Sequence, residues 1–205
     1  MNMDEAIQAT FPLIAAPTQG LIPPASASGT RYLVASDGVW RELTLPWVRF
    51  RHQLAAAAMR LPYGELEPII EIRCGGIPPE LIREFVSDAR EACPNEVAGV
   101  FLWHEPTDTW RYQRRESMSA SGSHIDYQEV RPLDDEHIVV DVHSHGRHRA
   151  FFSSEDNADD AGSMKFSLVL GNLDQAQPTS EMRLCMAGVV VNNATLGPDG
   201  ALGVS

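Results

Sequence analysis

The fold and the chemistry of the chain are decided by residues 142–156, which read VHSHGRHRAFFSSED. Residues 137–145, which end inside this stretch, alternate in a way that predicts a β-strand. In a strand, residues two apart point to the same face, with Cα atoms about 6 to 7 Å apart. The imidazoles of His143 and His145 are therefore expected on one face, where they can converge on a single cation.

A third ligand is expected from the element that follows this strand. A catalytic zinc site takes three protein ligands and leaves the fourth position to water. Asp156 is placed for this role, because residues 156–164 have the composition of a short acidic helix. Ser153 and Asp156 also form an ordinary helix N-terminal capping pair. Capping does not explain the paired histidines, so the sequence favours one zinc ion held by His143, His145 and Asp156.

A different site would use His148. The spacing His143-x-His145-x-x-His148 is similar to the zinc loop of metallo-β-lactamase-like hydrolases. That loop requires an aspartate immediately before its third histidine, and this chain has Arg147 there. A cation beside a metal ion has the wrong sign of charge. We therefore expect His148 to be solvated in a loop, where it remains available for a substrate contact.

Hydrolysis also needs a base that takes a proton from water and returns it to the leaving amine. Glu96 is the candidate. It lies between Pro94, which ends a predicted helix, and the apolar residues 97–103, which predict a buried strand. An acid at the mouth of a strand is more often merely solvated, so position alone does not assign this role.

Three fragments together resemble the JAMM (JAB1/MPN/Mov34) metalloproteases: residues 94–99, the His143-x-His145 pair, and Ser153-x-x-Asp156 seven residues later. The resemblance covers about residues 75 to 195. It implies that His143, His145 and Asp156 bind zinc, that Glu96 is the general acid and base, and that Ser153 stabilises the developing oxyanion. The implied fold is of the α/β (α+β) class, a curved mixed β-sheet flanked by helices. The implied activity is cleavage of isopeptide or peptide bonds after ubiquitin-like tails.

The chain departs from this family at two positions. The family often has proline after the second histidine, where this chain has Gly146, and often proline before the serine, where this chain has Phe152. Neither position ligates metal. The departures concern the rigidity of the loop and the fit of the substrate. A catalytically silent scaffold of the same fold is the alternative function, but all the expected catalytic positions are filled.

The whole chain also resembles the protein A family of PRTRC (ParB-related, ThiF-related cassette) systems, which are bacterial and often plasmid-borne. This resemblance rests on the N-terminal hairpin together with residues 150–160. These cassettes encode a ThiF-like adenylating enzyme. The resemblance therefore implies a ubiquitin-like protein or its conjugate as substrate, and the ThiF-like (E1-like) enzyme as a further partner.

Outward from the deciding stretch, the sequence predicts three regions. Residues 1–30, with four prolines and a Ser/Ala/Gly segment, are expected to form a flexible lead. Residues 31–75 are expected to form a small β-rich region, with a hairpin around Asp37 and Gly38 and a short helix in the Ala-rich residues 53–60. Residues 76–205 are expected to hold the metallohydrolase domain, with a helix before Pro94 and strands over 97–103, 109–114, 137–145, 166–170 and 183–191.

Composition excludes several classes of protein. The chain has 16 basic and 28 acidic residues, a net charge of −12, which argues against nucleic-acid binding. Its apolar runs are shorter than the roughly 20 residues that a membrane span needs, and the first residues lack a basic signal-peptide region, so we expect a cytoplasmic protein.

The one lysine, Lys165, reflects either codon composition or protection from lysine conjugation. The three cysteines have unrelated spacings and are expected to be small buried residues.

Overall fold

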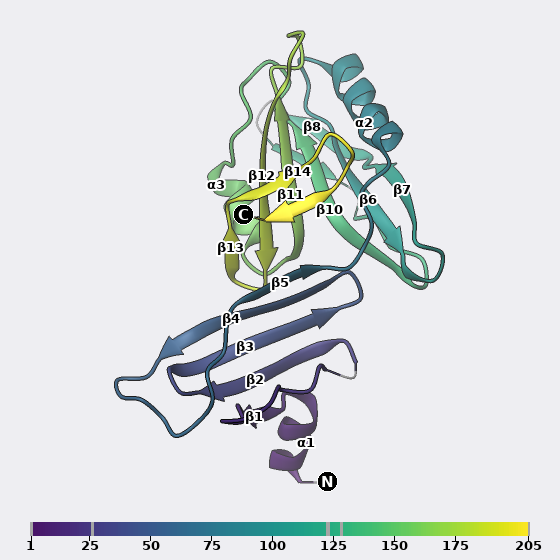
Figure 1. Cartoon of the computed structure of the whole chain (residues 1–205). Helices are drawn as coiled ribbons and strands as arrows, with labels where there is room; N and C mark the ends of the chain where they lie inside the picture. The colour runs from purple at the N-terminus through teal and green to yellow at the C-terminus, as the bar shows by residue number, and fades with distance from the viewer. Residues whose placement is uncertain (1, 26, 122–123, 128, 205) are drawn as a thin grey trace. The chain divides into compact units, whose positions relative to one another are not determined.

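The computed structural model describes residues 2–25, 27–121, 124–127 and 129–204, with side chains described outside residues 117–128. The chain divides into two compact units, residues 1–73 and 74–205 (Figure 1). This boundary lies two residues before the one expected after residue 75. None of the described helices is both long and apolar enough to span a bilayer.

The first unit is a five-stranded sheet preceded by a helix. Its strands hydrogen-bond in the order β1-β2-β3-β4-β5, with β1 parallel to β2 and the other neighbours antiparallel. A small core beneath this sheet contains Leu33 and Trp40. The elements are α1 (Met3–Thr10), β1 (Leu13–Ala15), β2 (Gly29–Ala35), β3 (Gly38–Leu45), β4 (Val48–Ala56) and β5 (Ile69–Ile72).

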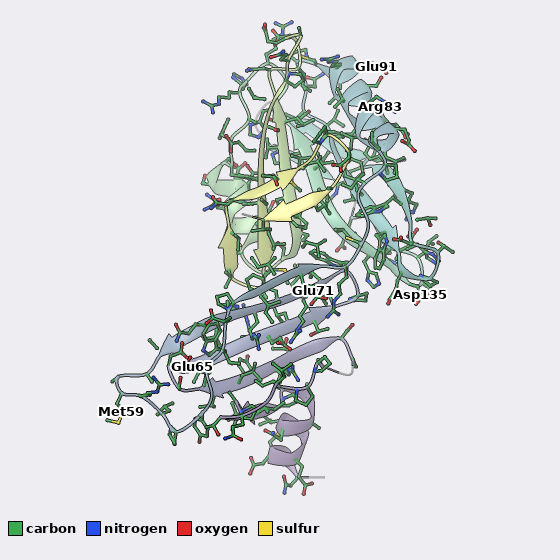
Figure 2. All side chains as sticks on the ribbon, viewed as in Figure 1. Met59, Glu65, Glu71, Arg83, Glu91 and Asp135 are labelled. Atoms are coloured by element: carbon green, nitrogen blue, oxygen red, sulfur yellow. The ribbon has the colours of Figure 1, made fainter. Side chains whose placement is uncertain are left out.

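The structure confirms one expectation for this unit and corrects two. The predicted hairpin is present as β2 and β3, which pair around Ser36 and Asp37. The expected flexible lead of residues 1–30 instead contains α1, whose N-terminus is capped by Asn2, and β1, which adds to the edge of β2. The short helix predicted in residues 53–60 is wrong, because β4 continues to Ala56 in the ladder with β3. Cross-strand pairing there outweighs the helix propensity of alanine. Figure 2 shows Met59 projecting from the loop that follows β4.

The second unit is built on a six-stranded sheet in the order β13-β12-β11-β10-β6-β7. Strands β10 and β11 are parallel, and the other neighbours are antiparallel. Two further two-stranded sheets are β8-β9 and β14-β15. The elements are α2 (Pro79–Ala92), β6 (Ala98–His104), the 3-10 helix η1 (Glu105–Thr107), β7 (Thr109–Arg114), β8 (Ser117–Ser121), β9 (His124–Tyr127), β10 (Glu136–Ser144), α3 (Ser154–Asp160), β11 (Met164–Gly171), β12 (Thr179–Met186), β13 (Val189–Val191), β14 (Ala194–Leu196) and β15 (Leu202–Val204).

The helices α2 and α3 lie on opposite faces of the six-stranded sheet (Figure 1). The register places Tyr112 on the face of Val140, and it places Arg183 and His143 on the face of Asp141. Successive strand residues point to opposite faces. Because α2 packs against the Tyr112 ring and Arg183 binds α3, the histidine lies on the α3 face. The expected mixed α+β class with a helix-flanked sheet is confirmed.

Helix α2 follows from its sequence. Pro79 lies in its first turn, where a missing N–H is tolerated, and Glu80 favours the positive end of the helix dipole. Phe85 and Ala89, four residues apart, are its buried residues. On the opposite side, Arg83 and Glu91 extend into solvent (Figure 2).

Of the three cysteines, Cys74 and Cys185 are buried as expected, and Cys93 is half-buried.

Candidate metal centre

The paired histidines lie at the end of the central strand β10. His143 pairs in register with Ala98 of β6 and Val169 of β11, so a hydrogen-bonded strand flanks it on each side. His145 follows the strand, and its backbone N–H donates to the carbonyl oxygen of Leu170 at 2.8 Å. The two imidazoles converge, with their Nε2 atoms 3.1 Å apart. The strand predicted over residues 137–145 ends one residue earlier, at Ser144, and the two imidazoles converge as expected.

Asp156 reaches the histidines from the first turn of α3. Its Oδ1 atom lies 3.3 Å from Nε2 of His143. Its Oδ2 atom accepts hydrogen bonds of 2.7 Å from both the backbone N–H and the hydroxyl of Ser153. In return, the N–H of Asp156 donates to the Ser153 oxygen at 3.1 Å. The capping pair and the ligand role are thus compatible, because the cap uses one carboxylate oxygen and turns the other toward His143.

The electrostatics of His143 and Asp156 favour a neutral imidazole beside an ionised carboxylate. Burial lowers the pKa of His143 below its ordinary value, and this effect outweighs the opposing attraction of Asp156. Burial alone would raise the pKa of Asp156, but His143 and the hydrogen bonds from Ser153 together lower it. Neutral imidazole and ionised carboxylate are the protonation states in which these side chains bind metal ions.

The geometry of this donor set fits a zinc ion. One ligand atom from each of His143, His145 and Asp156 lies within 4.8 Å of the other two. Ligands at 2.0 to 2.1 Å around a tetrahedral zinc ion are about 3.3 to 3.4 Å from one another. The distances of 3.1 Å between the two imidazole Nε2 atoms and 3.3 Å from His143 Nε2 to Asp156 Oδ1 are close to that spacing. Two imidazoles and a carboxylate are also a donor set that catalytic zinc sites use.

The ring of Phe151 supports the imidazole of His145 by packing against it. Nδ1 of His145 is buried and has no hydrogen-bond partner among the described residues. The Phe151 ring packs edge-on against this imidazole with a centroid distance of 4.5 Å. Phe151 is itself half-exposed, so it forms an apolar wall on one side of the centre.

Glu96 lies beside the centre because the next residue, Val97, is hydrogen-bonded to Ser144 at the end of β10. The N–H of Val97 donates to Oγ of the buried Ser144 at 3.0 Å, and the N–H of Ser144 donates to the Val97 carbonyl at 2.8 Å. Glu96 is exposed as a residue, but partial burial of its carboxyl group raises its pKa. His145 opposes this shift, and Asp156 adds to it. Ser144, the residue between the two histidines, was not among the predicted site residues.

His148 lies outside this group. It is exposed and is not among the described residues that could hold a metal ion together. Its backbone N–H donates to the carbonyl oxygen of His145 at 2.9 Å. The geometry therefore favours the ligand set with Asp156 over the set with His148.

Arg183, a buried residue of β12 that binds α3, was also not predicted from the sequence. Its guanidinium lies 3.8 Å from the centre of the Phe152 ring. Phe152, which stands where the JAMM family often has proline, therefore packs against Arg183. No local pattern marks Arg183, because its contact depends on the register of β12 against β11.

Comparison with known proteins gives two matched regions. Residues 78–185 match the family described as prokaryotic homologs of the JAB domain, and residues 1–73 match a domain of unknown function, DUF2016. No curated protein is significantly similar to the chain. The solution structure of a protein from Desulfitobacterium hafniense is similar at 18% sequence identity, with 56% of this chain and 86% of that chain covered and a TM-score of 0.43.

Proposed function

Since the chain belongs to the prokaryotic homologs of the JAB domain, we propose that it is a JAMM-type zinc-dependent peptidase or isopeptidase. The proposed reaction cleaves an amide bond at the C-terminus of a ubiquitin-like protein. The observation that carries the proposal is the convergence of His143, His145 and Asp156 within 4.8 Å. A carboxylate, Glu96, lies next to this group and responds electrostatically to two of its members.

His143, His145 and Asp156 would hold the zinc ion. When bound, zinc supplies a positive charge that polarises a carbonyl group and acidifies water. Glu96 accepts the proton of the attacking water at its carboxylate and then donates that proton to the leaving amine. The raised pKa of Glu96 suits both steps, because a group that acts first as a base and then as an acid works best when its pKa lies near the ambient pH.

Ser153 has two duties in this proposal. Its hydroxyl donates to Asp156 in the structure, which positions the carboxylate. Stabilising the oxyanion of a tetrahedral intermediate requires the hydroxyl to turn from Asp156 toward the substrate oxygen. A donor placed in this way often contributes about 3 kcal/mol to transition-state stabilisation. The backbone N–H of Ser153 still donates to Asp156 after that rotation, so the ligand keeps one of its two bonds from this residue.

The substrate and partners are proposed from the resemblance to PRTRC proteins. A ThiF-like adenylating enzyme acts on a ubiquitin-like carrier, and a peptidase of this type would process or release that carrier in the bacterial cytoplasm. An extended carrier tail could add as a further strand to an open edge of the sheet, where main-chain hydrogen bonds give sequence-tolerant affinity. In the described six-stranded sheet, the edge strands are β7 and β13.

The test combines metal analysis with cleavage of ubiquitin-like fusion proteins. We expect the wild type to contain about one zinc per chain. Asp156→Ala should lose the metal, whereas Asp159→Ala, which removes an exposed acid from the same helix, should keep it. Glu96→Gln should keep the metal and lose cleavage by at least about 100-fold, the usual effect of removing a general base. Glu91→Gln is the matched exposed control and should cleave normally.

Each outcome separates one alternative. A zinc-free wild type that binds the ubiquitin-like protein without cleaving it would replace the peptidase with the catalytically silent scaffold. Normal cleavage by Glu96→Gln would show that the assigned base is wrong. Loss of zinc in His148→Ala would favour the metallo-β-lactamase-like ligand set, whereas the proposed site tolerates this change.

A further inference from the structure

One buried guanidinium contacts the helix that carries Asp156 at several points. Arg183 of β12 donates from Nε and Nη2 to Oδ2 of Asp160, at 2.9 and 2.7 Å. Nη2 also donates to the backbone carbonyl of Asp156 at 3.0 Å, and Nη1 donates to Oδ1 of Asn157. These acceptors lie at the first, middle and last parts of α3. The side chain of Arg183 is only 5% exposed.

The same guanidinium also fixes the chain just before the helix. It stacks over the ring of Phe152, which immediately precedes the capping residue Ser153. Helix α3 has seven residues, and a helix this short has little stability of its own in water. Its position relative to the sheet must therefore come from tertiary contacts. Arg183 supplies such contacts on both sides of Asp156.

A second cation, Lys165 of β11, also pairs with α3. Comparing it with Arg183 distinguishes the effect of positive charge from the effect of the specific contacts that Arg183 makes. The ammonium group of Lys165 lies 3.3 Å from Oδ1 of Asp160 and donates to Asp141 of β10 at 2.6 Å. Lys165 therefore pairs with the same helix carboxylate as Arg183. The hydrogen bond to the Asp156 carbonyl and the stacking on Phe152, however, are made by Arg183.

We propose that Arg183 is a positioning residue that holds Asp156 at ligand distance from His143. This inference rests on the proposed zinc site. The planar guanidinium is required, because its fork of donors reaches a side-chain carboxylate and a backbone carbonyl at once while its face stacks on an aromatic ring. An ammonium group at the same place keeps the charge but cannot make this set of contacts.

The test measures zinc affinity by competition with a chromophoric chelator. Residues that orient metal ligands typically change metal affinity by 10- to 100-fold. We expect Arg183→Lys to weaken zinc binding by at least about tenfold while the far-ultraviolet circular dichroism stays that of the wild type. Lys165→Met, the matched control, removes a cation from Asp160 but leaves the Asp156 contact and should weaken binding by less than about threefold.

Cobalt substitution gives a second readout that does not depend on activity. The visible absorption of bound Co²⁺ reports its coordination geometry. We expect Arg183→Lys to change these bands and Lys165→Met to leave them unchanged. If Arg183→Lys is poorly folded, the double variant Arg183→Met with Asp160→Asn removes both buried charges, which avoids an unpaired acid. This double variant should fold and show the same loss of affinity.

The outcomes distinguish the inference from the function on which it rests. A wild type that binds no zinc overturns the proposed site. A wild type that binds zinc, together with Arg183→Lys or the double variant binding it equally well and with an unchanged cobalt spectrum, overturns the role of Arg183 alone. An equal loss in Lys165→Met would also overturn it, because charge at Asp160 would then be sufficient.

Discussion

Gly146, directly after the second histidine, is needed for the shape of the centre. Its φ of +53° lies in the left-handed region that glycine adopts readily. A Cβ atom at this position would lie 2.4 Å from the carbonyl oxygen of Pro94. Proline, which is frequent at this position in the JAMM family, has φ fixed near −65° and does not fit this backbone. The departure seen in the sequence is therefore a requirement of the way the Pro94 segment approaches His145.

We expect Gly146→Ala to destabilise the protein by about 1 to 3 kcal/mol, because it combines a strained φ with a backbone clash. The measurement is the free energy of unfolding from urea denaturation. Gly162→Ala is the control, since a Cβ atom there meets nothing within 4 Å. Equal stability of the two variants would show that the loop moves away from Pro94 without cost.

At the scale of elements, an ion pair ties strand β10 to strand β7 across β6. Arg111 of β7 donates from Nε and Nη2 to the two carboxylate oxygens of Glu136, at 2.6 and 2.7 Å. The hydrogen bonds from Arg111 lower the pKa of Glu136 from 4.5 to about 2. Glu136 begins the strand that ends at His143 and Ser144, so the pair fixes the far end of the strand that carries the centre.

This pair predicts a pH dependence of stability with a defined sign. A lowered pKa in the folded state means that the contribution is fully present above pH 4.5 and is lost as the pH falls toward about 2. We expect Glu136→Gln to be less stable than the wild type by about 1 to 2 kcal/mol at pH 7. The difference should shrink as urea unfolding is repeated at falling pH. Glu91→Gln, an exposed change, should show no such trend, and a constant difference for Glu136→Gln would contradict the assignment.

Elements with strong local signals could be predicted from the sequence, and elements defined by distant partners could not. The Asp37-Gly38 turn signal of the β2–β3 hairpin, the spacing of α2 and the alternation in β10 each specify a structure within a few residues. The run predicted as one strand over residues 183–191 ends at Met186 and resumes as β13, because Ala187 and Gly188 take positive φ angles in a turn. Helix α1 and the extension of β4 depend on capping and pairing that no local periodicity reveals.

The same division applies to the candidate site. His143, His145 and Asp156 could be selected from their spacing, and Glu96 only through the resemblance to the JAMM family; the structure brings the first three together beside the fourth. The contacts of Arg183 could not be selected, because they arise only when β11 and β12 pair in one particular register.

At the scale of the whole molecule, the single lysine of the chain is not a free amine. Lys165 is bonded to Asp141 and lies beside Asp160, and its side chain is 18% exposed. Burial lowers the pKa of Lys165, but the two carboxylates outweigh this effect and raise it. Acylation requires an accessible and deprotonated amine, and the ion pairs oppose both conditions.

We expect an amine-acetylating reagent to modify Lys165 at least about tenfold more slowly in the native protein than in urea, because a raised pKa and burial both reduce the reactive population. Peptide mass spectrometry measures the rate. In the matched variant Arg83→Lys, the new amine on the exposed face of α2 is an internal reference for a free lysine. Similar rates at positions 83 and 165 in the native protein would contradict the buried ion pair.

The capping box at the start of α3 has a consequence for how the protein is supplied with metal. Hydrogen bonds from Ser153 hold the Asp156 carboxylate, and the end of the paired strand β10 carries His143, so contacts within the protein position these side chains. Zinc fingers, by contrast, fold only when their ion arrives. We therefore expect newly made chains to fold in zinc-starved cells and to remain folded without the ion. Under the proposed function, the delivery of zinc, and not the rate at which new chains are made, would then limit the peptidase activity.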